Sequence, residues 1–202
     1  MKIWIRGAGD LATGIASRLY RSGHQLLMTE LPVPLTVRRT VALSRAVYEQ
    51  HAEVEDMSAL LVHSIKEALE VQAIGKIPVI IEEPEVILKE YQPDVVVGCG
   101  GYASYPMVHA AQQLHIPTVL LEVNAFPGVV TKSCAKKADR VLISFENTRE
   151  LLENRPNIRL TGAPVRGEII FADREKARKK MKLADDEKLV VSFWGSLGAL
   201  YM

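Results

Sequence analysis

Apolar residues along the chain fall into two kinds of segment, short unbroken runs and longer stretches with helical spacing. Unbroken runs are typical of strands covered on both faces of a parallel sheet, and spacings of three and four residues are typical of amphipathic helices. The pattern predicts strands at 2–6, 25–29, 77–81, 94–97, 118–121, 140–144, 158–160 and 189–193. It predicts helices at 11–22, 59–73, 85–91, 105–114, 126–138, 146–153 and 172–183. For residues 31–58, which carry two prolines and no clear period, it predicts a loop with one short helix near 44–48.

Strands and helices therefore alternate along the whole chain. This order predicts an α/β fold, a Rossmann-like and doubly wound sheet that is mostly parallel. The last predicted strand runs into a glycine turn, Gly195 to Gly198, where a covering helix would normally follow, and the sequence stops at Met202. The pattern thus predicts a single domain followed by the start of a truncated second domain.

Composition narrows the class of protein without changing this picture. Of the 202 residues, 48% are hydrophobic and 24% are charged, which is typical of a soluble globular domain. The two cysteines and five histidines have no metal-ligand spacing, so we expect no metal and no disulfide framework. No signal peptide or membrane-spanning run is visible, which favours a cytoplasmic location. A net charge of +1 and few aromatic residues give no case for nucleic-acid binding.

One stretch is strongly basic. Residues 172–182 carry six basic and two acidic side chains. A solvated helix face is the simpler interpretation of such a run, and contact with anionic lipid headgroups is the alternative.

The first candidate site is a glycine turn between a strand and a helix. Gly7-Ala8-Gly9-Asp10-Leu11-Ala12 matches the G-x-G-x-x-A form of the dinucleotide fingerprint, and Glu30 ends the next predicted strand. Small residues such as Gly7, Gly9 and Ala12 let backbone amides approach a pyrophosphate, and Glu30 stands where an acid binds a ribose hydroxyl. Against nucleotide binding, Asp10 places a negative charge at the turn, and many glycine turns only close a βα unit.

The second candidate follows the strand at 94–97. Gly100 and Gly101 offer exposed amides, and Tyr102 and Ser104 offer hydroxyls to a polar ligand. The alternative is a tight βα turn in which Ser104 caps the helix.

Three more loops follow later strands. Glu122 and Asn124 suit hydrogen bonds to a sugar or nucleotide, although Asn is also a common turn residue. Arg166 lies on a proline-fixed loop and could bind a diphosphate through its planar guanidinium group, or be a solvated charge. Ser196 belongs to a glycine loop without the lysine of a P-loop. Since no arrangement for nucleophilic catalysis is evident, we assign no catalytic residue.

The second to fifth of these loops together resemble the MurG family of peptidoglycan glycosyltransferases. Gly-Gly-Tyr-x-Ser, Ile-Pro-Thr-Val-Leu-Leu-Glu-x-Asn, Ala-Asp-Arg-Val, Gly-x-Pro-Val-Arg and Gly-Ser-x-Gly-Ala occur in the family's order and spacing, from about Lys89 to Met202. The family usually has His-Glu-Gln-Asn where this chain has Leu121-Glu122-Val123-Asn124, so any acid/base role of that histidine is absent here.

The MurG resemblance implies transfer of N-acetylglucosamine from UDP-GlcNAc to a polyprenyl-diphosphate lipid that carries muramyl-pentapeptide, without a cofactor, at the inner face of the cell membrane. It assigns Gly100, Gly101, Tyr102 and Ser104 to the lipid acceptor. It assigns Asn124, Arg166 and Ser196 to the nucleotide-sugar donor.

Residues 1–95 instead resemble the YqeB family of selenium-dependent molybdenum hydroxylase accessory proteins, through Arg6-Gly-Ala-Gly-Asp-Leu-Ala-Thr-Gly14 and Val37-Arg-Arg-Thr-Val41. We expect a YqeB-like segment at 1–92, a MurG-like segment at 93–170, and a linker helix with the first strand of a truncated second domain at 171–202. The join near Gln92 to Gly98 lies in a strand that both patterns share, which favours recombination or an assembly or gene-model error.

Three hypotheses follow. The first is a truncated MurG-like glycosyltransferase that is inactive as this chain. The second is an accessory protein that binds an adenine nucleotide at Gly7, Gly9, Ala12 and Glu30. The third is a folded fragment without a ligand.

Overall fold

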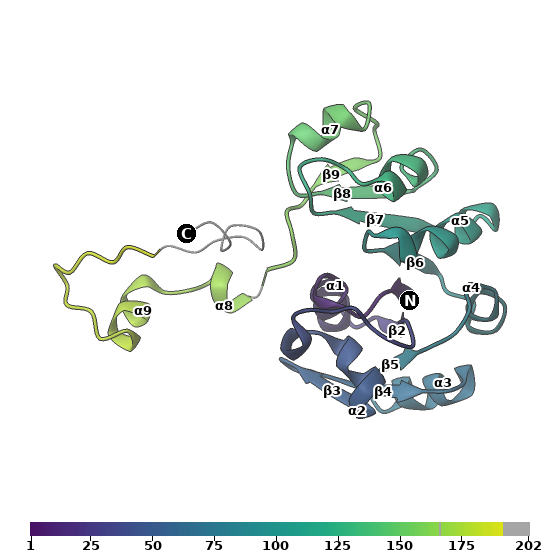
Figure 1. Cartoon of the computed structure of the whole chain (residues 1–202), viewed down its shortest axis with the longest axis horizontal. Helices are drawn as coiled ribbons and strands as arrows, with labels where there is room; N and C mark the ends of the chain where they lie inside the picture. The colour runs from purple at the N-terminus through teal and green to yellow at the C-terminus, as the bar shows by residue number, and fades with distance from the viewer. Residues whose placement is uncertain (166, 192–202) are drawn as a thin grey trace. The chain divides into compact units, whose positions relative to one another are not determined.

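Strand β1 (Lys2–Arg6) lies inside a sheet with β2 (Gln25–Thr29) on one side and β6 (Val95–Gly98) on the other, parallel to both. The computed structural model describes residues 1–165 and 167–191. The described residues form one nine-stranded sheet in the order β3-β4-β5-β2-β1-β6-β7-β8-β9 (Figure 1). The other strands are β3 (His51–Val54), β4 (Met57–Val62), β5 (Ile77–Ile80), β7 (Thr118–Glu122), β8 (Arg140–Ile143) and β9 (Ile158–Leu160).

All neighbouring strands are parallel except β3 and β4, which form an antiparallel pair at one edge. This order confirms the predicted Rossmann-like sheet. The segments 1–92 and 93–164 both contribute to it, because β1 pairs with β6 through Trp4 opposite Val96 and Ile5 opposite Val97.

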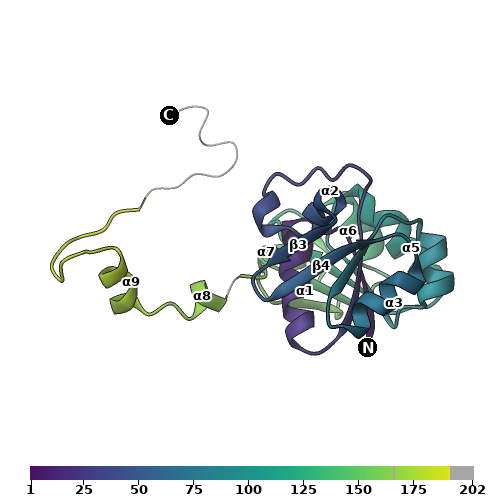
Figure 2. The same ribbon diagram turned by 90° about the horizontal axis from the view of Figure 1, so that it is seen from below.

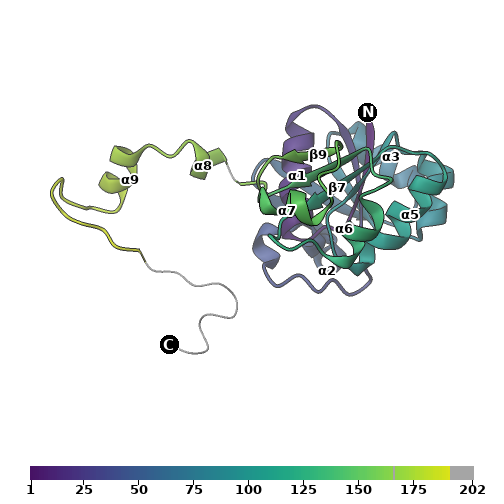
Figure 3. The ribbon, with the colours of Figure 1, turned by 90° about the horizontal axis from the view of Figure 1, so that it is seen from above.

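Helices cover both faces of the sheet. They are α1 (Asp10–Arg21), α2 (Ala46–Glu49), α3 (Ile65–Ala73), α4 (Pro84–Val86), α5 (Tyr105–Gln113), α6 (Val129–Cys134) and α7 (Asn147–Leu151). Short 3₁₀ turns are η1 (Arg39–Val41), η2 (Leu43–Arg45) and η4 (Tyr102–Ser104), and a π-helical turn is η3 (Ile87–Tyr91). In Figures 2 and 3, α1 lies on the opposite side of the sheet from α3 and α5.

Alternation along β1 divides the core between these two faces. Ile3 and Ile5 pack with α1 and α2 in one buried cluster, whereas Trp4 packs with α3, α5 and α6 in the other. Successive side chains of a strand point to opposite faces, so a strand covered on both sides is apolar throughout. Trp4 is fully buried, and its Nε1 donates to Thr29 Oγ1 at 2.9 Å.

The predicted elements are confirmed over most of the sheet and wrong in one region. Residues 31–58 contain β3 and the start of β4, where we expected a loop, and β4 extends to Val62, where we expected a helix from residue 59. The helix begins only at Ile65, because Ser64 Oγ accepts from Glu67 N at 3.2 Å and the Glu67 carboxylate accepts from His63 N at 2.8 Å. This reciprocal arrangement is a capping box, which fixes a helix start.

The chain divides after Pro164 into two compact units. The second unit contains α8 (Gly167–Ile170) and α9 (Arg174–Lys180), and Asp173 Oδ1 caps α9 by accepting from Lys176 N at 2.8 Å. No residue of α9 is buried. The strand predicted at 189–193 is not present over its described part, Leu189 to Val191, and its remainder lies outside the described residues.

Gly98, the last residue of β6, tests how tightly α5 packs on the sheet. A Cβ at this position would lie 2.8 Å from Val108 Cγ2 and 3.1 Å from Leu120 Cδ2. We expect Gly98→Ala to lower the free energy of unfolding by about 1–3 kcal/mol, because a well-packed core has no room for an added methyl group. Urea denaturation measures this change, with the exposed Ser133→Ala as control. Equal stability of the two variants would contradict the packing seen here.

Candidate functional site

The carboxyl ends of β1 and β6 form a topological switch point. The connection from β1 runs through α1 on one face, and the connection from β6 runs through α5 on the other. Open α/β sheets bind their ligands at such a point, since the loops diverge and leave a crevice. A cavity of about 350 Å³ lies here. It is lined by Leu11, Cys99, Gly100, Gly101, Tyr102, Leu121, Glu122, Val123, Asn124, Gly128, Val129, Val130 and Thr131.

The loop after β6 supplies one wall of this cavity. Gly101 has φ 73° and ψ 158°, a conformation that is essentially limited to glycine, and a Cβ there would meet nothing within 4 Å. The glycine is therefore required by the backbone and not by crowding. Tyr102 is 80% exposed. Ser104 is buried and does not line the cavity, because its hydroxyl donates to Gly101 O at 2.9 Å and closes the loop.

The loop after β7 is organised by Glu122, whose side chain is buried. Its Oε1 accepts from Asn124 N and Asn124 Nδ2, both at 3.0 Å. Its Oε2 accepts from Gly128 N at 2.9 Å and from Thr131 Oγ1 at 2.8 Å. A buried carboxylate is tolerated when donors satisfy its oxygens, and here four donors do so.

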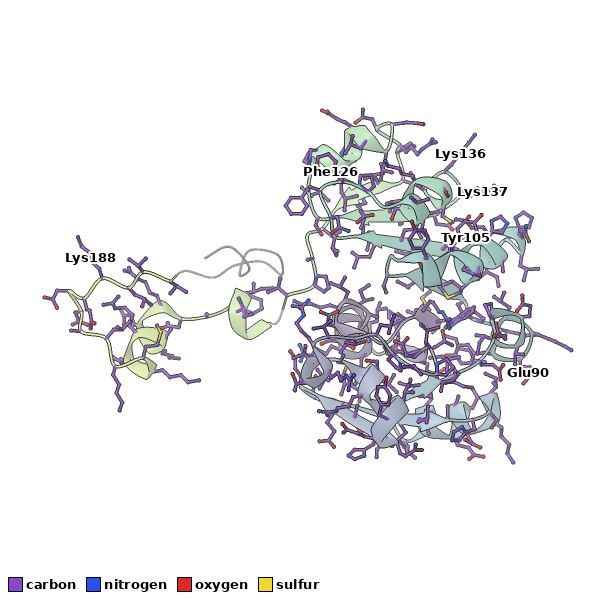
Figure 4. All side chains as sticks on the ribbon, viewed as in Figure 1. Glu90, Tyr105, Phe126, Lys136, Lys137 and Lys188 are labelled. Atoms are coloured by element: carbon purple, nitrogen blue, oxygen red, sulfur yellow. The ribbon has the colours of Figure 1, made fainter. Side chains whose placement is uncertain are left out.

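A second brace holds the same loop from the side of α7. Thr148 is fully buried, and its Oγ1 contacts Asn124 O at 3.2 Å and Ala125 O at 3.0 Å. Between the two braces, Phe126 is 76% exposed, and Figure 4 shows its ring pointing away from the sheet. The loop is thus fixed at both ends while its middle residue faces solvent.

The turn between β1 and α1 is closed by residues of the chain itself. Glu30 Oε2 accepts from Ala8 N at 2.7 Å, and Glu30 Oε1 accepts from Leu31 N at 2.8 Å. Asp10 forms an ion pair with Arg38. Among the residues of the predicted fingerprint, only Leu11 lines the described cavity, so Gly7, Gly9, Ala12 and Glu30 lie beside it and not in its wall.

The structure thus brings together four of the predicted site residues, Gly100, Gly101, Tyr102 and Asn124, around one cavity. Arg166 and Ser196 lie outside the described residues. Sequence reasoning missed Leu11, Thr131 and Thr148. Of these, only Leu11 stood in a motif, and the two threonines carried no signal because nothing in the sequence indicates which backbone their hydroxyls reach.

Two searches concern the described residues alone. Over 1–165 and 167–191, no group of three or more His, Cys, Asp or Glu side chains could hold a metal ion. Within the same part of the chain, no helix is long and apolar enough to cross a bilayer.

A family model matches residues 11–143, that of the glycosyltransferase family 28 N-terminal domain. The match begins in α1 and crosses the join expected near residue 93. No support for the YqeB resemblance comes from these comparisons.

Curated relatives are also similar to this chain. The UDP-N-acetylglucosamine--N-acetylmuramyl-(pentapeptide) pyrophosphoryl-undecaprenol N-acetylglucosamine transferase of Acetivibrio thermocellus is 43% identical over 119 residues, 59% of this chain and 32% of that protein. The protein of the same name from Carboxydothermus hydrogenoformans is 46% identical over 117 residues, 57% of this chain and 31% of that protein. The chain spans about a third of the length of these relatives.

Among solved structures, the MurG of Acinetobacter baumannii aligns with a TM-score of 0.53 at 20% identity. The alignment covers 83% of this chain and 46% of that one. At this identity the likeness supports the fold.

Cys99 gives the cavity a measurable pH dependence. Burial raises the pKa of its thiol from 9.0 to about 12. The folded chain therefore keeps a proton that the unfolded chain loses, so this stabilisation is complete below pH 9.0 and is lost as the pH rises toward about 12. We expect Cys99→Ala to make the free energy of unfolding fall less steeply over this range.

Urea denaturation at a series of pH values measures the slope. Burial also raises the pKa of Tyr91 to about 12, so part of the slope remains in the variant. If wild type and Cys99→Ala lose stability equally, the thiol does not titrate late.

Proposed function

This chain belongs to the glycosyltransferase family 28 N-terminal domain family, and on that premise we propose that it forms the acceptor-side part of an N-acetylglucosaminyltransferase of peptidoglycan synthesis. The donor would be UDP-N-acetylglucosamine, acting as substrate and not as cofactor. The acceptor would be a muramyl-pentapeptide on undecaprenyl diphosphate, the group that the relatives' names print.

The observation that carries this proposal is the cavity at the switch point. Gly100, Gly101, Tyr102 and Asn124 were assigned to substrate from the sequence motifs, and all four line it. We assign the glycine loop to the acceptor and Asn124 to the donor. Arg166 and Ser196, outside the described residues, would bind the donor diphosphate. Residues 171–202 would then be a linker helix and the beginning of a second domain.

A lipid acceptor also implies contact with a membrane surface. We propose that the basic side chains of α9 and the residues around it, Arg174 to Lys182, face anionic headgroups at the inner side of the cell membrane. All of α9 is free of buried residues, so its cations are available to a surface. This location is peripheral.

Transfer needs groups on both substrates at once, because the transition state is stabilised by contacts made to donor and acceptor together. We expect the purified chain to show no turnover of UDP-N-acetylglucosamine with the lipid acceptor, measured by release of UDP. Steady release of UDP that requires the acceptor would overturn the expectation that the chain alone is inactive.

Acceptor binding tests the proposal itself. Gly101→Ala forces an L-residue into a glycine conformation, and we expect it to weaken binding of a water-soluble analogue of the lipid acceptor about tenfold. Tryptophan or tyrosine fluorescence titration of the full chain measures the affinity. The matched control is Gly23→Ala, since Gly23 has φ 78° and an open surrounding but ends α1 away from the cavity. Wild-type binding by Gly101→Ala, or no binding by the wild type, would count against the proposal.

Nucleotide binding at Gly7, Gly9, Ala12 and Glu30 is the second candidate function. The placement that favours it is a glycine turn between β1 and α1 with Glu30 directly after β2. Calorimetry with ADP, NAD and UDP-N-acetylglucosamine separates the candidates. Binding of an adenine nucleotide that Gly9→Val abolishes would favour the second, whereas binding of UDP-N-acetylglucosamine alone would favour the first.

A further inference from the structure

The wall of the switch-point cavity carries no positive charge. Among the described residues that line it, none is a lysine, arginine or histidine. Apolar side chains such as Leu11, Leu121 and Val130 make up much of the surface, and the carboxylate of Glu122 is part of it. A diphosphate bound inside would meet only backbone amides and a neighbouring negative charge. An uncharged ligand meets no such cost, because it loses less hydration on entering the cavity.

The two oxygens of Glu122 act on different parts of the loop. Oε2 receives Gly128 N and Thr131 Oγ1 and so fixes the start of α6. Oε1 receives both the backbone N–H and the side-chain Nδ2 of Asn124, each at 3.0 Å. One oxygen therefore serves the scaffold, and the other serves a residue of the cavity wall.

This contact fixes which way the Asn124 carboxamide faces. An ionised carboxylate only accepts hydrogen bonds, so Nδ2 must face Oε1 and the carbonyl Oδ1 must turn away from it. No residue in 1–165 or 167–191 is recorded as donating to Asn124 Oδ1. The cavity thus holds an oriented acceptor that is left for a ligand.

We propose that this cavity binds an uncharged, hydroxyl- and amide-bearing group, the ring of an N-acetylhexosamine, whose donor is received by Asn124 Oδ1, with Glu122 as the positioning residue. The proposal rests on the proposed function and refines it, because it places a sugar ring and not a diphosphate inside the cavity. The ring can belong to the nucleotide sugar or to the lipid-linked acceptor, since both carry the same groups.

The first test uses two small probes on the ¹⁵N-labelled full chain. Methyl N-acetyl-β-glucosaminide should shift the Asn124 side-chain amide and the Gly128 backbone amide, with an affinity that changes less than about twofold between low and moderate salt. Inorganic diphosphate should not shift these signals. Shifts at Asn124 with diphosphate alone, or a sugar affinity that falls steeply with salt, would overturn the proposal.

The second test is a double-variant cycle on the sugar affinity. Glu122→Gln replaces one accepting oxygen by a donor, so we expect about a tenfold weaker affinity as the Asn124 amide loses its fixed orientation. Asn124→Ala should weaken binding by a similar factor. If Glu122 acts through Asn124, adding Glu122→Gln to Asn124→Ala should cause less than about a further twofold loss. Equal effects of Glu122→Gln in both backgrounds would make Glu122 merely structural and overturn its role.

Two controls keep the result interpretable. Glu90→Gln, at an exposed site labelled in Figure 4, removes a carboxylate far along the chain and should leave the affinity unchanged. Should Glu122→Gln fail to fold, Asn124→Ala decides alone, because Asn124 is exposed and its loss leaves the backbone contact to Glu122. Unchanged sugar affinity in Asn124→Ala would then overturn the proposal.

Competition identifies the source of the ring and separates the two proposals. Displacement of the probe by UDP-N-acetylglucosamine assigns the donor ring to the cavity, and displacement by the acceptor analogue assigns the acceptor ring. Failure of both to displace it overturns the inference. If the acceptor analogue binds with dependence on Gly101 but the sugar probe does not bind, the proposed function stands and the inference fails.

Discussion

The parallel pairing of β1 with β6 is the constraint on which the candidate site depends. These strands come from segments 90 residues apart in the chain, and Trp4 opposite Val96 sets their register. Because α1 leaves β1 on one face and α5 leaves β6 on the other, the loops after the two strands separate at the carboxyl edge. The cavity exists because of that separation. A slip of one residue in this pairing would turn Trp4 to the opposite face and remove the register of both loops.

Within the cavity, polar groups are arranged by hydrogen bonds that ligands never touch. Glu122 and Thr148 are both buried, and both hold the β7–α6 loop through its backbone. The loop after β6 follows the same principle, since Ser104 closes it through Gly101 O. Exposed residues of the cavity wall thus depend on buried ones. The residue types that a motif highlights are therefore a mixture of ligand contacts and supports.

How far the sequence predicts this molecule depends on the range of the interactions involved. Strands β1, β2 and β5 and helix α1 were found because buried apolar runs and helical spacing are local signals. The β3–β4 pair was missed, since Leu60 and Leu61 fit a helical spacing as well as a strand, and only pairing with β5 decides between them. The capping box at Ser64 and Glu67 was a local signal that would have placed the helix start correctly.

The same distinction applies to the site. Gly100, Gly101, Tyr102 and Asn124 lie in motifs and could be named from the sequence, and parallel strand order brings them together. The role of Ser104 could not be decided, because a hydroxyl that caps a loop and one that contacts a ligand occur in the same sequence context. The division of Glu122 between Asn124 and Thr131 depends on a three-dimensional arrangement of four donors.

Bracing of the β7–α6 loop has a consequence for the kinetics of recognition. A loop that is already held by Glu122 on one side and Thr148 on the other has little freedom left to lose when a ligand arrives. The entropic cost of association then falls mainly on the ligand, and the encounter does not wait for a rearrangement of this wall. Differences in affinity between related ligands should accordingly arise from how fast they leave and not from how fast they enter.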